Sequence, residues 1–246
     1  MADLSTVTAL ITGAAGGMGK AFVEDFIQNG ARVVFTDINE TTGKTIIQAK
    51  LGDHSLFLKH DVTSVADWQR VIETGEAKFG PFNVLVNNAG IDIMKPITDM
   101  TPEDYDKVVH INQYSIFYGM KAIVPSMKRA GKGSIVNISS IGGLVAIPNT
   151  IDYGASKFAI RGMTKDAALD LVDDHIRVNS VHPGMVETPI LKNIPAENKS
   201  KIAQGVPMKR LGKPEEIANV VNFLASDKSS FITGQEIVAD GGYTMV

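Results

Sequence analysis

The chain of 246 residues contains no cysteine. Disulfide bridges, thiolate nucleophiles and thiolate metal ligands are therefore excluded, and a reducing compartment suits the protein. Long hydrophobic runs are also lacking, since no segment approaches the roughly 18 apolar residues that a membrane-spanning helix needs. Residues 1–5 lack the charged and apolar regions of a signal peptide. We expect a cytoplasmic protein that has no membrane partner.

An excess of positive charge is lacking as well. The chain has 24 lysines and arginines against 27 aspartates and glutamates, and its isoelectric point is about 6.0. Binding to nucleic acid requires a basic surface, so we expect no nucleic-acid partner. The five histidines include no pair at the His-x-x-x-His spacing of a zinc helix, and no Gly-x-Ser-x-Gly motif is present. We therefore expect neither a metal centre nor a serine hydrolase.

The composition is that of an ordinary globular protein, with 44% hydrophobic and 21% charged residues. An α/β chain of this length often forms one domain around one continuous core. The sequence shows no internal repeat, low-complexity tract or Pro/Ser-rich linker that would divide it. We expect a single domain over residues 1–246.

Short apolar runs alternate with segments whose apolar residues recur at helical spacing. The runs predict buried strands at residues 7–12, 32–36, 55–59, 84–87, 133–139, 177–182 and 235–239. The helical patterns cover residues 21–29, 64–79, 102–130, 153–173 and 215–224. Strands separated by helices pair in parallel through right-handed crossovers. The expected fold is therefore a Rossmann fold, a doubly wound parallel sheet of about seven strands with helices on both faces and ligands at the carboxyl ends of the strands.

A glycine-rich turn, residues 12–19, joins the first predicted strand to the first predicted helix. In such a turn one glycine permits the tight bend, another lets the backbone approach a pyrophosphate, and the last lets helix and strand pack closely. The helix N-terminus adds amide donors for phosphate. A glycine-rich turn alone is weak evidence, but this place between strand and helix predicts a dinucleotide site. The residues assigned to it are Gly13, Gly17, Met18 and Gly19.

Asp37 lies 18 residues after Gly19, at the end of the second predicted strand. A carboxylate at that place accepts hydrogen bonds from ribose hydroxyls, whereas an ordinary solvated surface aspartate is the alternative. It would also repel a 2′-phosphate, and neither Thr36 nor Ile38 beside it offers a cation. The sequence therefore favours NAD over NADP, with Asp37 and Ile38 at the ribose.

Two further strand ends carry candidate cofactor contacts. Asp61 and Val62 follow the third strand, where the carboxylate would reach the adenine amino group, although a helix cap explains an aspartate there equally well, with Thr63 and Ser64 as rival caps. Asn88, Ala89 and Gly90 follow the fourth strand, and the glycine would let the chain pass close to a ribose.

Tyr153 and Lys157 are four residues apart and share one face of a predicted helix. A free phenol has a pKa of about 10, and a nearby ammonium favours its ionised form, as the cationic nicotinamide would. Tyr153 would then act as base in alcohol oxidation and as acid in ketone reduction. Such a pair alone is usually a plain helix surface. Ser140, 13 residues before Tyr153, adds a hydroxyl that would polarise the substrate oxygen, and Asn112 is a further polar candidate.

Together these motifs resemble the classical short-chain dehydrogenase/reductase family over nearly the whole chain. The matching segments are Thr12 to Gly19, Asn87 to Gly90, Asn112, Ser140, Tyr153 to Lys157, Asn179 to Gly184 and Asp240 to Gly242. The resemblance implies a catalytic tetrad of Asn112, Ser140, Tyr153 and Lys157, in which Asn112 relays protons through water and Lys157 also holds the nicotinamide ribose. It implies nicotinamide contacts from Pro183, Gly184, Val186 and Thr188, and assembly as a homotetramer. His182 stands at a variable position of the pattern, and we interpret it as structural.

Specificity is expected in three loops around the nicotinamide, residues 91–94, 141–148 and 185–206. They are largely apolar, which favours a lipophilic alcohol or ketone, and residues 187–205 resemble a substrate lid. Within the family the chain looks most like secondary-alcohol dehydrogenases and ketone reductases. The alternative is a 3-oxoacyl-[acyl-carrier-protein] reductase that docks its carrier through Lys128 and Arg129. If the protein is not an enzyme, the alternative is a sensor that binds a dinucleotide without turning it over.

Overall fold

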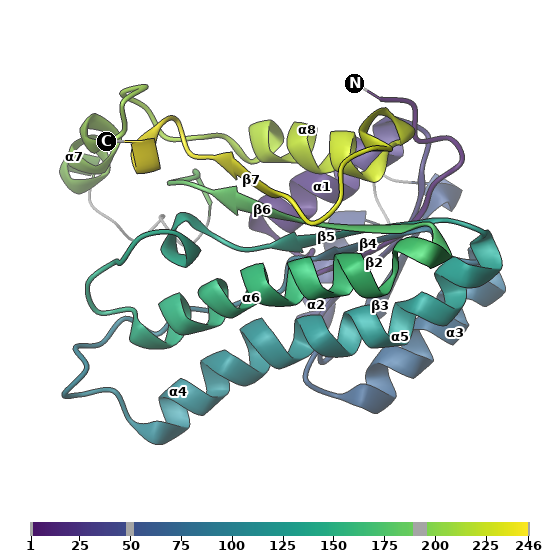
Figure 1. Ribbon diagram of the computed structural model, residues 1–246, viewed down its shortest axis with the longest axis horizontal. Helices are drawn as coiled ribbons and strands as arrows, with labels where there is room; N and C mark the ends of the chain where they lie inside the picture. The colour runs from purple at the N-terminus through teal and green to yellow at the C-terminus, as the bar shows by residue number, and fades with distance from the viewer. Residues whose placement is uncertain (1, 48–51, 189–195, 246) are drawn as a thin grey trace.

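A single parallel sheet runs through the computed structural model, which describes residues 2–47, 52–188 and 196–245 (Figure 1). Its seven strands are ordered β3-β2-β1-β4-β5-β6-β7. Their bounds are β1 Thr8–Thr12, β2 Arg32–Asp37, β3 Ser55–Lys59, β4 Val84–Asn87, β5 Gly133–Ile138, β6 Ile176–Pro183 and β7 Glu236–Ala239. The order reverses between β1 and β4, where a crevice at the carboxyl ends is the usual ligand position. The predicted Rossmann fold is confirmed.

Helices cover both faces of the sheet (Figure 1). One face is covered by α1 (Gly17–Gln28) and α8 (Pro214–Ala225), and the other by α3 (Val65–Phe79), α5 (Ser115–Ala130) and α6 (Ile151–Asp170). Successive strand residues point to opposite faces, so Ile11 joins the core beneath α1 while Leu10 joins the core beneath α3. Among the described helices, none has the length and apolarity needed to cross a membrane.

The predicted helix over residues 102–130 is interrupted. It consists of α4 (Pro102–Val109), a π-helical turn (His110–Tyr114) and α5. The remaining predicted helices agree with the structure to within three residues at each end, except that the first begins at Gly17 rather than residue 21.

Two helices were not predicted, α2 (Glu40–Ile47) and α7 (Ala196–Gly205). Threonine and glycine in the middle of α2 are poor helix formers. The segment of α7 is mainly polar and carries no continuous apolar stripe. Neither helix therefore shows the periodic pattern on which the other predictions depended.

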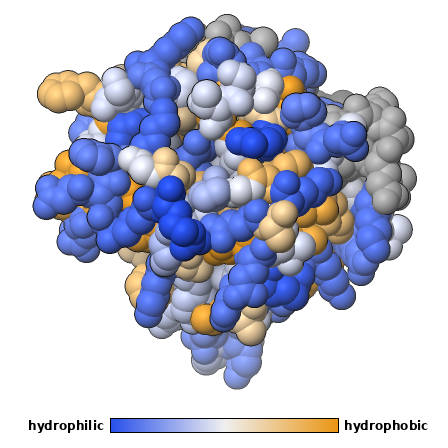
Figure 2. All heavy atoms as spheres, turned by 90° about the vertical axis from the view of Figure 1, so that its right-hand side faces the viewer, coloured by the Kyte–Doolittle hydropathy of each residue, from blue (hydrophilic) through white to orange (hydrophobic). Residues whose placement is uncertain are grey.

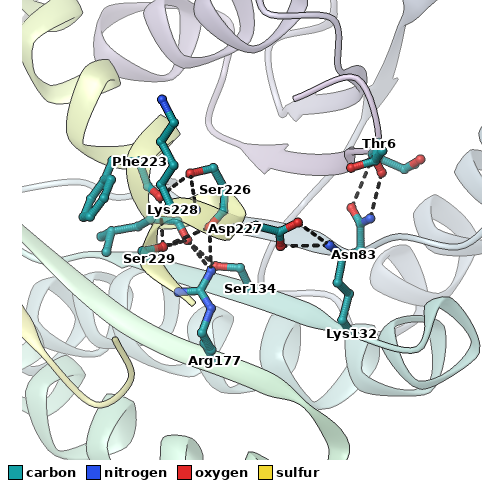
Figure 3. Close-up of polar contacts among 12 residues, drawn as sticks. Thr6, Asn83, Lys132, Ser134, Arg177, Phe223, Ser226, Asp227, Lys228 and Ser229 are labelled. Atoms are coloured by element: carbon teal, nitrogen blue, oxygen red, sulfur yellow. Dashed lines mark hydrogen bonds and ion pairs between the residues drawn. The ribbon is translucent and has the colours of Figure 1, made fainter. Parts of the chain in front are cut away.

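The amino ends of the strands form a polar face that carries a hollow of about 620 Å³ (Figure 2). Figure 3 shows how this end is held together. The guanidinium of Arg177 donates to the backbone carbonyls of Leu224 at 2.7 Å and Ser226 at 3.3 Å, and Lys132 pairs with Asp227 at 2.8 Å. These bonds fasten the end of α8 and the turn after it to β6 and to the residue before β5. The predicted catalytic residues lie at the opposite end, near the carboxyl ends of the strands.

Candidate active site

The glycine-rich turn between β1 and α1 leaves no room for side chains at two of its glycines. Gly13 has a φ of +62°, and a Cβ there would lie 2.7 Å from the Cα of Ala89. A Cβ on Gly19 would lie 2.4 Å from the carbonyl oxygen of Gly13. Helix α1 begins at Gly17, and its N-cap, Gly16, makes no side-chain hydrogen bond to the first turn. No side chain therefore caps the amides of that first turn, which fits the binding of a dinucleotide phosphate by a helix N-terminus.

The structure also places Gly17 and Met18, the two other residues predicted for the dinucleotide site. Gly17 has a φ of +54°, a conformation that side chains rarely adopt. Met18 packs against the hydrophobic core beneath α1. The side chain of Met18 thus belongs to the core, and a cofactor contact of Met18 stays a prediction.

Asn88 holds the glycine-rich turn in place. Its side-chain amide donates to the carbonyls of Thr12 and Gly13, each at 2.9 Å. The Thr12 hydroxyl in turn accepts from the backbone amides of Asn88 at 3.0 Å and Ala89 at 3.2 Å. The end of β4 is therefore fastened to the end of β1, and the Asn88 amide positions the turn.

Asp37 lies at the tip of β2 beside the same turn. One carboxylate oxygen accepts from the Ala15 amide at 3.0 Å, and the other accepts from the Asn39 amide at 2.9 Å. Ile38 follows with 64% of its surface exposed, so it offers an apolar surface next to the carboxylate. The structure thus brings Asp37 and Ile38 to the glycine-rich turn.

The structure excludes one of the two alternatives for Asp61, the role of helix cap. Ser64 is the N-cap of α3 and accepts from the Asp67 amide at 3.2 Å, so Asp61 is not the cap. Asp61 instead accepts from the amide and hydroxyl of Thr63 at 2.9 and 2.7 Å. The carbonyl of Val62 accepts from the indole of Trp68 at 2.9 Å. Contact of Asp61 and Val62 with adenine stays a prediction.

Asn112 is fully buried in the π-helical turn between α4 and α5. Its side chain bonds both backbone groups of Ile91 at 2.8 Å, and its amide also donates to the Ser156 hydroxyl at 3.2 Å. A Cβ on Gly90 would lie 3.2 Å from the Asn112 oxygen and 3.6 Å from the Lys157 ammonium nitrogen. Asn112 therefore joins the loop after β4 to α6, and π-helical turns are frequent at functional sites.

Lys157 is buried beneath this loop. Its ammonium donates to the carbonyl of Ile138 at 2.9 Å, and its nitrogen lies 5.4 Å from the centre of the Tyr153 ring. Burial lowers the pKa of Lys157 to about 8, although the carboxylate of Asp92 opposes this effect. The structure thus places Tyr153, Lys157 and Asn112 in one group at the carboxyl ends of β4 and β5.

The Ser140 hydroxyl accepts from the Gly142 amide at 3.1 Å. The Tyr153 ring lies against Gly142, since a Cβ there would be 3.2 Å from its Cε1 atom. Burial raises the pKa of Tyr153, a hydrogen bond with Ser140 opposes the rise, and the charge of Asp92 adds to it. In the protein alone, desolvation of the phenol outweighs the hydrogen bond with Ser140. That Lys157 favours the phenolate stays a prediction.

His182 supports the backbone of Ser140. The ring is fully buried, one nitrogen bonds the Ser140 carbonyl at 3.1 Å, and the other bonds the Ser180 hydroxyl at 2.9 Å. Burial lowers the pKa of His182, which keeps the ring neutral near pH 7. Because both ring nitrogens have partners in the protein, the structural interpretation of His182 is supported.

The chain that leaves β6 turns closely against the segment after β7. Gly184 donates to the Ala239 carbonyl at 3.0 Å, and a Cβ on Gly184 would lie 2.7 Å from the Cα of Asp240. Val186 is buried and forms a parallel bridge with Gly212. Pro183 through Thr188 thus extend from the carboxyl end of β6, where nicotinamide contacts were predicted. Part of the predicted lid, including Ile190 and Leu191, lies outside the described residues.

Sequence reasoning missed two aspartates beside this group, Asp92 and Asp152. Asp152 is fully buried, and one of its oxygens accepts from the Tyr153 amide at 2.8 Å. Asp92 acts electrostatically on both Tyr153 and Lys157. Their sequence positions, two residues after Gly90 and one before Tyr153, were the signal that could have found them.

The buried ammonium of Lys157 predicts a pH-dependent stability. Its pKa is 10.5 unperturbed and about 8 in the folded protein, so between these values the unfolded chain binds more protons. The stability of the wild type relative to Lys157→Met should rise from pH 8 to pH 10.5, by on the order of 3 kcal/mol, and this gain should be lost as the pH falls through 8. Urea denaturation of both proteins across this range measures it, and parallel stability curves would contradict it.

The sheet order, the glycine-rich turn at its reversal point and the serine, tyrosine and lysine beside it define a Rossmann-type oxidoreductase site. The chain matches the family model described as Enoyl-(Acyl carrier protein) reductase over residues 13–244. Taken with the relatives below, this match shows that the chain belongs to the short-chain dehydrogenase/reductase family, whose members use a nicotinamide cofactor. Within the described ranges, no three histidine, aspartate or glutamate side chains form a metal-binding group.

Curated relatives match over nearly the full length. A 3-alpha-(or 20-beta)-hydroxysteroid dehydrogenase of Mycobacterium tuberculosis is 44% identical over 95% of this chain and 88% of its own. An NADP-dependent (R)-specific alcohol dehydrogenase of Lentilactobacillus kefiri is 41% identical over 96% of each chain. A cyclopentanol dehydrogenase of Comamonas testosteroni is 40% identical over 99% of each chain. This chain is thus similar to oxidoreductases whose names specify alcohols and hydroxysteroids.

Proposed function

We propose that the protein is an NAD-dependent dehydrogenase or reductase that interconverts a lipophilic secondary alcohol and its ketone. The observation that carries the proposal is the grouping of Asn112, Ser140, Tyr153 and Lys157 beside the glycine-rich turn. The names of the hydroxysteroid, alcohol and cyclopentanol dehydrogenases among the relatives support it.

The nicotinamide, when bound, supplies or accepts the hydride. Tyr153 donates a proton to the ketone oxygen during reduction and removes it from the alcohol during oxidation. The Ser140 hydroxyl donates a hydrogen bond to the same oxygen and polarises it. Lys157 holds the nicotinamide ribose and keeps positive charge near the phenol, and Asn112 links Lys157 to solvent through water. The close packing of Gly90 against Asn112 and Lys157 supports this assignment.

The chain's residues fit a dinucleotide, because side chains at Gly13 and Gly19 would fill the space of the turn. One relative is named NADP-dependent, so the choice of NAD depends on Asp37. We assign the remaining contacts as predicted from the sequence. The cofactor residues are Gly13, Gly17, Met18, Gly19, Asp37, Ile38, Asp61, Val62, Asn88, Ala89, Gly90, Tyr153, Lys157, Pro183, Gly184, Val186 and Thr188.

The substrate side of the site is apolar. Ile147 approaches Gly142 next to the Tyr153 ring, with its Cδ1 atom 3.4 Å from the position of a Cβ on that glycine. Ile141 is buried, and Met94 exposes 66% of its surface on the loop after β4. We assign residues 187–205, which include α7, to a lid over this side.

We also propose that the protein is a cytoplasmic homotetramer. Exposed apolar side chains on the outer helices and on the edge strand support association with further copies, since 48% of Phe117, 44% of Phe158 and 41% of Val238 are accessible. These three residues lie on α5, α6 and β7.

A carrier-protein reductase is the second candidate, and the description of the family model favours it. The basic residues suggested for docking a carrier do not support it. Lys128 pairs with Asp174 at 2.7 Å and Arg129 with Glu76 at 2.5 Å, and both lie at the end of α5 near the amino ends of the strands. A carrier docked there would face away from Tyr153.

An assay of NADH absorbance separates the candidates. For oxidation, the purified protein receives cyclohexanol or 1-phenylethanol with NAD or NADP. For reduction, it receives an acetoacetyl thioester with NADH or NADPH. We expect turnover of the alcohols with NAD and a lower kcat/KM for the thioester. A higher kcat/KM for the thioester would favour the carrier-protein reductase, and absence of turnover with every substrate would contradict an enzyme of either kind.

A further inference from the structure

The hydroxyl of Ser140 is prepared as a hydrogen-bond donor by the turn that follows it. Ser140 is the N-cap of a 3₁₀ turn (Ile141–Gly143) and has an extended backbone, with a φ of −169° and a ψ of 164°. Its hydroxyl oxygen accepts from the Gly142 amide at 3.1 Å. The hydroxyl hydrogen therefore stays available for donation. A hydrogen bond with Ser140 opposes the rise in the pKa of Tyr153, as a donor to the phenolate oxygen would.

The backbone carbonyl of Ser140 accepts from two donors. One is the Gly143 amide at 3.0 Å, and the other is the Nδ1 atom of His182 at 3.1 Å. A carbonyl oxygen only accepts, so Nδ1 carries the ring proton, and Nε2 of the neutral ring accepts from the Ser180 hydroxyl at 2.9 Å. His182 is fully buried. Its ring is thus fixed at both nitrogens, with one of them directed at Ser140.

The chain on either side of Ser140 is held without help from His182. The Ser139 amide donates to a backbone carbonyl of β6 at 2.8 Å. Beyond the turn, the guanidinium of Arg161 donates to the carbonyl of Gly143 at 3.0 Å. Loss of the His182 side chain should therefore leave the loop in place and release only the peptide unit between Ser140 and Ile141.

We propose that His182 is a positioning residue that acts through Ser140: its Nδ1–H group holds the Ser140 carbonyl and thereby fixes the direction in which the Ser140 hydroxyl donates. The inference rests on the proposed function and adds to it a residue that touches neither substrate nor cofactor. When the released peptide unit rotates, it moves the Gly142 amide relative to the hydroxyl that this amide orients. Removal of a donor to the reacting oxygen costs about a hundredfold to a thousandfold in kcat, and a misdirected donor should cost about tenfold.

The first test moves the donor within the side chain of residue 182. In His182→Asn the amide nitrogen reaches the position of Nδ1, whereas in His182→Gln it reaches the position of Nε2, so only His182→Asn keeps the bond to Ser140. His182→Leu fills similar space without a donor. With the alcohol of highest kcat/KM, kcat should fall about tenfold in His182→Leu and His182→Gln and stay within about threefold of the wild type in His182→Asn. His182→Asn and His182→Gln are matched, because both bury the same amide group.

A double-mutant cycle separates positioning from support of the fold. His182→Leu is combined with Ser140→Ala, which removes the hydroxyl that His182 directs. If His182 acts through Ser140, the kcat of the double variant should be within about twofold of the residual kcat of Ser140→Ala. A residue that only supports the fold would lower kcat by the same factor in both backgrounds.

Three results would overturn the inference and leave the proposed function intact. They are an undiminished kcat in His182→Leu, equal losses in His182→Asn and His182→Gln, and equal factors in the two arms of the cycle. The proposed function is tested by the wild type and Ser140→Ala in the same experiment. Absence of alcohol turnover by the wild type, or full activity of Ser140→Ala, would contradict the proposed chemistry and the inference together.

Discussion

Replacing Tyr153 with phenylalanine is expected to lower kcat for alcohol oxidation by about a hundredfold to ten-thousandfold. Only the hydroxyl is lost, because the phenyl ring keeps its place against Gly142 and near the ammonium of Lys157. A proton then has no route from the alcohol oxygen to a positioned base. Steady-state kinetics with the best alcohol measure the loss, and fluorescence titration with NADH should give a Kd close to that of the wild type.

A matched variant separates loss of chemistry from loss of structure. Tyr105→Phe removes a hydroxyl from α4, away from the glycine-rich turn, and should keep kcat within about twofold of the wild type because such surface changes have small effects. Full activity in Tyr153→Phe would show that another group transfers the proton. A parallel loss of activity and of NADH binding would show that the substitution disturbs the fold around Lys157.

The central strands could be predicted from the sequence because they are buried on both faces. In β1 and β5 every residue is buried, so each reads as a short apolar run bounded by glycine or polar residues. The parallel pairing followed from the alternation of strands and helices through right-handed crossovers. The order of the strands in the sheet came from the structure.

Features that depend on contacts between distant segments could not be predicted. The π-helical turn at Asn112 has no pattern of its own, and it becomes intelligible only when Asn112 is seen to hold Ile91 and Ser156. The same is true of Asn88, whose sequence position suggested a cofactor contact and whose side-chain amide donates to the carbonyls of Thr12 and Gly13.

The electrostatics of the site were the least predictable part. Spacing alone suggested that Lys157 lowers the pKa of Tyr153, but burial affects both groups in the opposite sense, disfavouring phenolate and ammonium alike. Asp92 and Asp152 contribute charges, and although they lie close to Gly90 and Tyr153 along the chain, they belong to none of the recognised motifs. Burial is a property of the folded chain, so the direction of these shifts emerges only with the structure.

Replacing Asp37 with serine is expected to change the ratio of kcat/KM with NAD to kcat/KM with NADP by about a hundredfold in favour of NADP. Two effects act in the same direction. Loss of charge-assisted hydrogen bonds to the ribose hydroxyls lowers kcat/KM with NAD by roughly tenfold to hundredfold, and loss of the negative charge removes the repulsion of a 2′-phosphate. The ratio is measured for the wild type and for Asp37→Ser, with one alcohol at saturating concentration and each cofactor varied.

Asp37 also accepts from the amides of Ala15 and Asn39, so serine risks loosening the turn itself. Asp37→Asn keeps an acceptor oxygen at the same place and removes only the charge. If repulsion of the 2′-phosphate decides the preference, Asp37→Asn should gain activity with NADP nearly as much as Asp37→Ser does. If both variants lose activity equally with the two cofactors, Asp37 supports the turn without selecting the cofactor, and the assignment of NAD would be wrong.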